Sequence, residues 1–360
     1  MSRYLLPRLE TLCPYEPGEQ PQDRRYIKLN TNENPFPPSP RVLEALQSEE
    51  ALALNLYPDP TNAPLLHALA KENGVRPEDV FVGNGSDEVL GFAFEAYADA
   101  THPVVVPEIT YSFYEVFAAL YGAPLRRVPL NEDWSMPVER LCGQGCFVAL
   151  ANPNAPTALA LKLDEVERIV AGNPGQVVLV DEAYVDFGGE SCAPLLARYD
   201  NLLIVRTFSK SRSLAGARLG YALGNRELIE DLNRVKNSFH PYNINRLTMA
   251  AGVAALEDES YFVNCVRAVC RTRDWMAEQL RARGFLVTDS RTNFLFYMHP
   301  SLPGGELAQR LREKGVLVRH FDTALLCNHI RMSIGAEDEM YTVLGKIDEI
   351  LKEAGICCAR

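Results

Sequence analysis

Five short runs of apolar, mostly β-branched residues recur along the first 210 residues, and they constrain the fold more than any other feature of the sequence. The runs are Val80–Val82, Val104–Val106, Cys146–Ala151, Val177–Val180 and Leu202–Arg206. A polar or turn segment follows each run, and several are followed by a stretch with helical periodicity, such as Ser86–Ala98 or Asp164–Ala171. Strands that are apolar on both faces are typical of a mainly parallel sheet covered by helices on both sides. The expected fold class is therefore α/β.

The pattern changes on either side of this region. Residues 1–40 are rich in proline and charge, which predicts irregular chain with the first helix starting near Pro40. We expect a large domain over 41–249, a smaller α+β domain over 250–360, and an N-terminal segment over 1–40 that joins the small domain. Beyond Asn245 the expected helices are Arg246–Glu257, Ser260–Arg283, Gly305–Lys314 and Glu337–Glu353, and the expected strands are Phe285–Thr288, Asn293–Met298, Val316–Arg319 and Ile330–Ile334.

The overall composition excludes several classes of protein. The net charge of −11 argues against a nucleic-acid-binding protein, which needs a clustered basic face. No apolar run approaches the ~20 residues that span a bilayer, and the N-terminus lacks the apolar core of a signal peptide, so we expect a cytoplasmic protein. The nine cysteines and six histidines lack metal-site spacings and contain no Cys-x-x-Cys pair, so we expect reduced thiols and no metal.

Ligands of open parallel sheets bind beyond the carboxyl ends of the strands, so the residues directly after each strand are candidates for a site. Asp181 follows Val177–Val180 and places a carboxylate at the end of an apolar strand. That charge is costly unless it has a cationic partner. A turn or helix-cap aspartate is the alternative interpretation.

Lys210 follows the next strand, together with the hydroxyls of Thr207 and Ser209. A lysine with desolvating or cationic neighbours can have a lowered pKa, which makes its amine a usable nucleophile. Arg218 follows eight residues later, and with the two hydroxyls it would form a site for a dianion. Alone, Lys210 would be interpreted as a surface lysine in a loop, and it is the spacing to the hydroxyls and to Arg218 that favours a site.

Two further strand ends carry weaker signals. The first apolar run leads into Gly83-Asn-Gly85-Ser86-Asp87, a turn before a helix whose free amides would bind phosphate, although an ordinary capping box explains the same residues. Asn154 lies in Asn-Pro-Asn-Ala-Pro-Thr-Ala after the third run, which could be a simple proline turn.

Taken in order, Asn-Pro-Asn-x-Pro-Thr, Asp-Glu-Ala-Tyr and Ser-Lys with its distant arginine resemble the class I and II aminotransferases, most closely the histidinol-phosphate aminotransferases. The resemblance extends from Leu29–Pro35 through Leu56–Pro58 and residues 292–294 to Ile330–Gly335. It implies the fold type I architecture of enzymes that depend on pyridoxal 5′-phosphate, with a large domain and a smaller one. It also implies this cofactor and a homodimer.

The same resemblance implies roles for individual residues. Lys210 forms the internal aldimine with the cofactor and later moves a proton between the substrate Cα and C4′ of the cofactor. Asp181 pairs with the pyridinium nitrogen, which keeps the ring an electron sink, and Tyr184 hydrogen-bonds the phenolic oxygen of the ring. Tyr57 matches a tyrosine that reaches the cofactor phosphate from the neighbouring subunit. The other implied cofactor-binding residues are Gly85, Ser86, Asp87, Tyr111, Asn154, Thr207, Ser209 and Arg218.

On the substrate side, Arg331 matches the arginine that receives the anionic group of the substrate, and Arg319 and Tyr15 match positions near it. The expected reaction transfers an amino group between a phosphorylated or aromatic amine, best histidinol phosphate, and 2-oxoglutarate in amino-acid biosynthesis. The alternatives are a decarboxylase of a phosphorylated amino acid, a general aromatic aminotransferase and a non-catalytic ligand sensor. A nicotinamide-dependent dehydrogenase would need a Gly-x-Gly-x-x-Gly turn that the sequence lacks.

The sequence departs from the family pattern at two positions. Ala155 and Ala158 stand where the family usually has asparagine and glycine, and that asparagine donates to the phenolic oxygen of the cofactor. Either Asn154 substitutes for the lost donor, or Tyr184 acts with less help. We expect a tuned but active site, because Lys210, Asp181 and Arg218 are all present.

Overall fold

The computed structural model describes residues 2–10 and 12–356, and its centre is a seven-stranded sheet in the order β2-β8-β7-β6-β5-β3-β4. The strands are β2 Val80–Gly83, β3 Val104–Pro107, β4 Leu125–Val128, β5 Phe147–Ala151, β6 Val178–Asp181, β7 Leu202–Thr207 and β8 Gly220–Gly224. Every pairing is parallel except those of β8, which runs antiparallel to both of its neighbours. The predicted α/β class with a mainly parallel sheet is confirmed.

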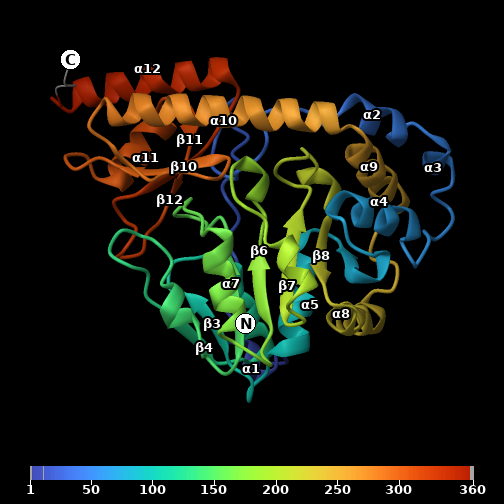
Figure 1. Ribbon diagram of the computed structural model, residues 1–360. Helices are drawn as coiled ribbons and strands as arrows, with labels where there is room; N and C mark the ends of the chain where they lie inside the picture. The colour runs from blue at the N-terminus through green and yellow to red at the C-terminus, as the bar shows by residue number, and fades with distance from the viewer. Residues whose placement is uncertain (1, 11, 357–360) are drawn as a thin grey trace.

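Helices cover both faces of this sheet (Figure 1). Alternate residues of β6 show how one strand serves both faces, since Val178 and Val180 belong to one apolar cluster and Leu179 to the other. The helices on the first face are α2 Pro40–Leu46, α4 Ala63–Asn73, α7 Leu163–Ala171 and α9 Arg246–Glu257. Those on the second face are α5 Ser86–Tyr97, α6 Phe113–Tyr121 and α8 Arg226–Phe239. This burial on both sides explains why the strands read as continuous apolar runs.

A second, antiparallel sheet lies in the C-terminal third, in the order β12-β13-β10-β9. Its strands are β9 Leu286–Val287, β10 Phe294–Met298, β12 Arg319–His320 and β13 Ile330–Ser333. The helices there are α10 Glu259–Arg281, α11 Gly304–Glu313 and α12 Glu337–Glu353, and α10 and α12 lie side by side (Figure 1). They share a separate apolar core with the strands. In Figure 1 the arrow of β6 points toward these elements, so the carboxyl end of the large sheet faces them.

The expected strand Val316–Arg319 is wrong as a single element. The chain forms β11 Val316–Leu317, which pairs parallel with β1 Ile27–Lys28, and then β12, which pairs antiparallel with β13. The N-terminal segment supplies backbone groups to the first half of the run, so the chain changes partner at Val318. This change sets Arg319 directly opposite Arg331.

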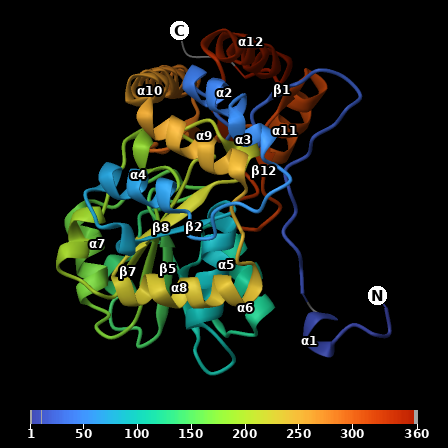
Figure 2. The same ribbon diagram turned by 90° about the vertical axis from the view of Figure 1, so that its right-hand side faces the viewer.

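The N-terminal segment is less irregular than its composition suggests. It contains α1 Pro7–Glu10 and β1, and Figure 2 shows α1 standing apart from the rest of the chain. The helix predicted to begin near Pro40 is α2, with Ser39 as its N-cap, and α3 Glu49–Leu52 follows. The pairing of β1 with β11 supports a joined N-terminal segment, and the division at 40 and 249 stays a prediction.

Within the described residues, no helix is both long and apolar enough to cross a membrane. The seven cysteines that the structure describes are free thiols. Cys357 and Cys358 lie outside the described residues.

Candidate active site

A cavity of about 380 Å³ lies between the carboxyl ends of β6 and β7, the start of α5, and the small-domain strands β12 and β13. Strand topology alone predicts a site at this edge of the large sheet. The predicted site residues that line it are Tyr15, Ser86, Asp87, Tyr111, Asp181, Tyr184, Thr207, Ser209, Lys210, Arg218, Arg319 and Arg331.

Asp181, the last residue of β6, is a buried carboxylate at the floor of this cavity. The hydroxyl of Tyr114 and the amide of Ala183 each donate to it at 3.1 Å. Burial raises the pKa of Asp181 to about 7, and these two hydrogen bonds only partly offset it. No ion pair to Asp181 exists among the described residues, so a cationic ligand group beside it would relieve the cost of burial.

Asp87, at the start of α5, contacts two other predicted site residues, Tyr111 and Arg218. The hydroxyl of Tyr111 donates to its Oδ1 at 2.9 Å, and Nη2 of Arg218 lies 3.1 Å from its Oδ2. Burial, with the nearby carboxylate of Asp87 as the second cause, raises the pKa of Tyr111 well above its usual value. The Asp87–Arg218 pair is half-exposed toward the cavity, where an anionic ligand can reach the guanidinium.

The backbone at Gly85 and Arg218 lets the guanidinium of Arg218 lie close to the start of α5. Gly85 is the N-cap of α5, with φ +86° and no side-chain cap, so the first amides of the helix are left open at the cavity edge. A Cβ on Gly85 would lie 2.5 Å from Nη2 of Arg218. Arg218 itself adopts the left-handed conformation with φ +55°, which is uncommon for a residue other than glycine. Open amides beside an arginine make an anion site.

Lys210 follows β7 and is half-buried at the cavity wall. Its Nζ lies 3.4 Å from the carbonyl of Thr31 and 5.8 Å from the centre of the Tyr184 ring. Thr207 and Ser209 are buried beside it, and Oγ1 of Thr207 accepts the amide of Ser209 at 3.1 Å. The amine therefore faces the same space as Asp181.

Arg331 and Arg319 form the opposite wall. They are direct cross-strand partners on β13 and β12, so both side chains lie on one face of the sheet. Arg331 donates to the carbonyl of Asn30 at 2.9 Å, and its buried Nε has no partner. Burial lowers the pKa of Arg331, and the charge of Arg319 adds to the effect. Neither arginine forms an ion pair within the described part of the chain, which leaves a doubly cationic wall open to an anion.

The family "Aminotransferase class I and II" matches residues 24–347. The chain belongs to this family. It is 48% identical to a histidinol-phosphate aminotransferase of Chromohalobacter salexigens over 98% of this chain and 100% of that one. It is 50% identical to histidinol-phosphate aminotransferase 1 of Bordetella parapertussis over 97% and 99% of the two chains.

Among solved structures, the chain is similar to the histidinol-phosphate aminotransferase of Sinorhizobium meliloti in complex with pyridoxal-5′-phosphate. The TM-score is 0.89 at 25% identity, with 98% of this chain and 99% of that chain covered. The structural neighbours share fold type I, so the predicted architecture is confirmed together with the family.

Three predicted site residues of this aminotransferase do not line the cavity: Gly85, Asn154 and Tyr57. Gly85 is the N-cap residue directly before the lining residues Ser86 and Asp87. The amide of Asn154 donates to the carbonyl of Ile109 at 3.0 Å and to Oγ1 of Thr157 at 2.9 Å, and it borders a different hollow. Ala155 lines the cavity in its place, so the hypothesis that Asn154 replaces the missing donor is wrong. Tyr57 is 76% exposed and stacks on Tyr242 at 4.6 Å.

Two residues that the sequence did not single out complete the site of this aminotransferase. Tyr114 donates to Asp181, and Nδ2 of Asn32 donates to the hydroxyl of Tyr184 at 2.8 Å. Asn32 lies within Leu29–Pro35, a segment that carried the family resemblance but no assigned role. Tyr114 lies in the same Tyr-Ser-Phe-Tyr stretch as Tyr111.

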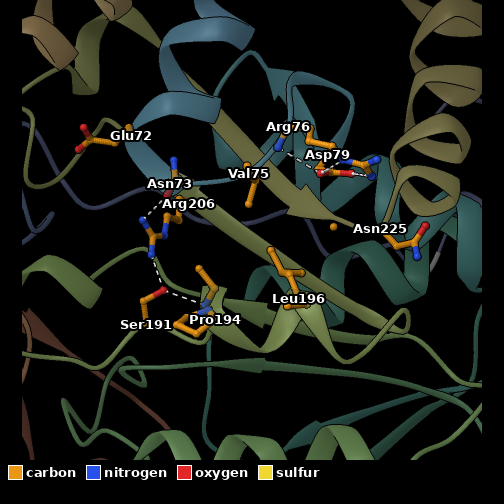
Figure 3. A pocket seen from close by; sticks show the side chains of 14 residues that line it. Glu72, Asn73, Val75, Arg76, Asp79, Ser191, Pro194, Leu196, Arg206 and Asn225 are labelled. Atoms are coloured by element: carbon orange, nitrogen blue, oxygen red, sulfur yellow. Dashed lines mark hydrogen bonds and ion pairs between the residues drawn. The ribbon is translucent and has the colours of Figure 1, made fainter.

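A wider hollow of about 760 Å³ lies elsewhere, beside α4 and the end of β8 (Figure 3). Figure 3 shows Arg206 pointing toward Asn73 and Ser191, and Arg76 paired with Asp79. Because these charged groups already have partners, this hollow is a poor candidate for the active site despite its size.

Proposed function

We propose that this aminotransferase uses pyridoxal 5′-phosphate to move the amino group of histidinol phosphate to 2-oxoglutarate. The observation that carries the choice of substrate is the arginine pair on β12 and β13. Like charges directly opposite each other destabilise a sheet unless an anion lies between them. Two guanidinium groups suit the dianion of a phosphate monoester, and Arg331 alone suffices for the carboxylate of an amino acid.

The residues at the other end of the cavity fit the cofactor. When bound, pyridoxal phosphate supplies an aldehyde that condenses with amines and a ring that withdraws electrons from the substrate Cα. Asp181 supplies the negative charge for the ring nitrogen, since its carboxylate is buried without a cation. The open amides of α5, the hydroxyls of Thr207 and Ser209, and Arg218 supply the phosphate site.

Lys210 and the two tyrosines act on the ligands themselves. The amine of Lys210 would hold the cofactor aldehyde, and it would accept the proton that leaves the substrate Cα. Tyr111, fixed by its hydrogen bond to Asp87, covers the ring face. Tyr184 donates to the phenolic oxygen of the ring. Tyr15 reaches the cavity near Arg319 and Arg331 and helps to position the substrate.

A homodimer would complete the cofactor site. From the last residue of α3 onward, a run of exposed apolar side chains supports burial against a second copy of the chain; it consists of Leu52, Leu54, Leu56 and Tyr57. Tyr57 is then available to the phosphate site of the partner subunit. Sedimentation should give a dimer, and Tyr57→Phe should raise the dissociation constant of the cofactor about tenfold, the loss of one hydrogen bond to a charged group.

A half-reaction experiment tests the proposed reaction. The purified enzyme with its cofactor is mixed with one amine at a time, and the loss of its visible absorbance is followed. Histidinol phosphate should remove the absorbance quickly, and 2-oxoglutarate should restore it. Histidinol is the matched control, because it lacks only the phosphate and should react much more slowly.

Equal rates for histidinol and histidinol phosphate would overturn the phosphate assignment. Faster reaction with phenylalanine or tyrosine would favour the general aromatic aminotransferase. The decarboxylase is not favoured, since the relatives named above are aminotransferases over their whole length. Release of carbon dioxide from a phosphorylated amino acid when no oxo acid is present would favour the decarboxylase instead. The cytoplasmic location stays a prediction.

A further inference from the structure

The hydroxyl of Tyr184 has a single hydrogen-bond partner in the described part of the chain, and that partner is Asn32. Nδ2 of Asn32 donates to it at 2.8 Å. Asn32 is 2% exposed and Tyr184 9% exposed, so water does not compete freely for the contact. A phenolic hydroxyl has one proton and accepts through its lone pairs. Since the amide occupies an acceptor position, the proton of Tyr184 is free to be donated into the cavity.

Asn32 is held in a fixed orientation by contacts with the small domain. Oγ of Ser333 accepts the backbone amide of Asn32 at 2.8 Å and donates to its Oδ1 at 3.3 Å. Nδ2 of Asn293 donates to the carbonyl of Asn32 at 3.0 Å. Oδ1 of Asn32 accepts from Ser333 and Nδ2 donates to Tyr184, so both ends of the side-chain amide have a partner. The residue also has φ +55°, a conformation that asparagine tolerates better than most residues.

The cavity wall at position 155 lacks such a donor. Ala155 lines the cavity with a methyl group, and the amide of Asn154 is engaged outside it. We propose that Asn32 is a positioning residue that compensates for Ala155, by orienting the Tyr184 hydroxyl so that its proton is donated to the phenolic oxygen of the cofactor. This inference rests on the proposed use of pyridoxal phosphate.

The test is the pH midpoint of the visible absorbance of the enzyme with its cofactor and without substrate. Donation to the phenolic oxygen stabilises its negative charge, so weaker donation raises the midpoint. Asn32→Ala should raise it by about one pH unit, the scale of one hydrogen bond to a charged group. Asn32→Asp should raise it further, because a carboxylate accepts the proton of Tyr184 and adds negative charge.

Two further comparisons show whether Asn32 acts through Tyr184. In a Tyr184→Phe background, Asn32→Ala should cause no additional shift. In an Asn32→Ala background, Ala155→Asn should lower the midpoint again by supplying a new donor. Asn154→Ala is the matched control. It removes a buried side-chain amide next to Ala155 that bonds outside the cavity, so the midpoint should stay unchanged.

The proposal is overturned if Asn32→Ala keeps its cofactor and its midpoint, or if it shifts the midpoint equally in the Tyr184→Phe background. If Asn32→Ala does not fold, the nearly isosteric Asn32→Asp decides, and an unchanged midpoint in that variant overturns the proposal as well. Absence of any visible absorbance in the unmodified protein would instead contradict the proposed cofactor chemistry.

Discussion

Two partly buried arginines, Arg331 at the active-site cavity and Arg206 at the hollow beside α4, have opposite surroundings. Arg206 lies 2.8 Å from the carboxylate of Glu182 and also donates to Asn73 and Ser191. Arg331 has one carbonyl partner, a buried Nε without any, and Arg319 as its cross-strand neighbour. The first arginine is satisfied by the fold, and the second is left for a ligand. Unpaired charge, more than the size of a hollow, identifies the active site.

The strongest test of this contrast replaces Arg331. Arg331→Met should lower kcat/KM for histidinol phosphate about a thousandfold, or about 4 kcal/mol, because the main anion contact is lost. The free energy of unfolding should not fall, since an unpaired guanidinium is expensive to bury. Steady-state kinetics and urea unfolding measure the two effects, and the visible absorbance should survive. Normal turnover would remove Arg331 from the site.

Arg206→Met should give the reverse result. It leaves Glu182, whose side chain is fully buried, without its cation, so the free energy of unfolding should fall by about 3 kcal/mol. The KM for histidinol phosphate should stay the same in the fraction that is folded. Arg76→Met, which removes an exposed guanidinium at the same hollow, is the control and should cause little change in urea unfolding. A raised KM in Arg206→Met would contradict the view that Arg206 serves only the stability of the fold.

Asp181 makes the stability of the cofactor-free protein depend on pH. Its pKa in the folded chain is about 7, above the usual 3.8, so the folded state binds the proton more tightly than the unfolded state does. Stability should therefore fall as pH rises, by about 2 kcal/mol between about pH 5 and pH 7. Urea unfolding at several pH values measures the slope. Asp181→Asn should flatten it, and an unchanged slope in that variant would assign the effect to another group.

The smallest expected effect sharpens the role of the second arginine. Arg319→Ala should raise the KM for histidinol phosphate about tenfold, close to 1.4 kcal/mol, because one of two guanidinium groups is lost. The rate with histidinol should hardly change, since it has no phosphate to bind. An equal loss with both amines would indicate that Arg319 supports the structure of β12 instead of the phosphate.

Much of the site could be predicted because its residues follow strands of recognisable pattern. Asp181 is the last residue of β6 and Lys210 lies just beyond the end of β7, and neighbouring parallel strands end at the same edge. β4 and β8 were harder to predict. β4 is an edge strand with two exposed arginines, and β8 is bounded by glycines, so neither has a long apolar run.

The sequence by itself determined the parallel sheet, the strand-end residues and the family, because strand periodicity and short motifs depend on residues close together in the chain. The tertiary structure alone decided which side chains and strands contact one another. It moved Asn154 out of the cavity, brought Asn32 to Tyr184 across 152 positions of the chain, and set Arg319 opposite Arg331 by changing the partner of one short strand. Such contacts depend on how distant segments pack, and no local pattern records them.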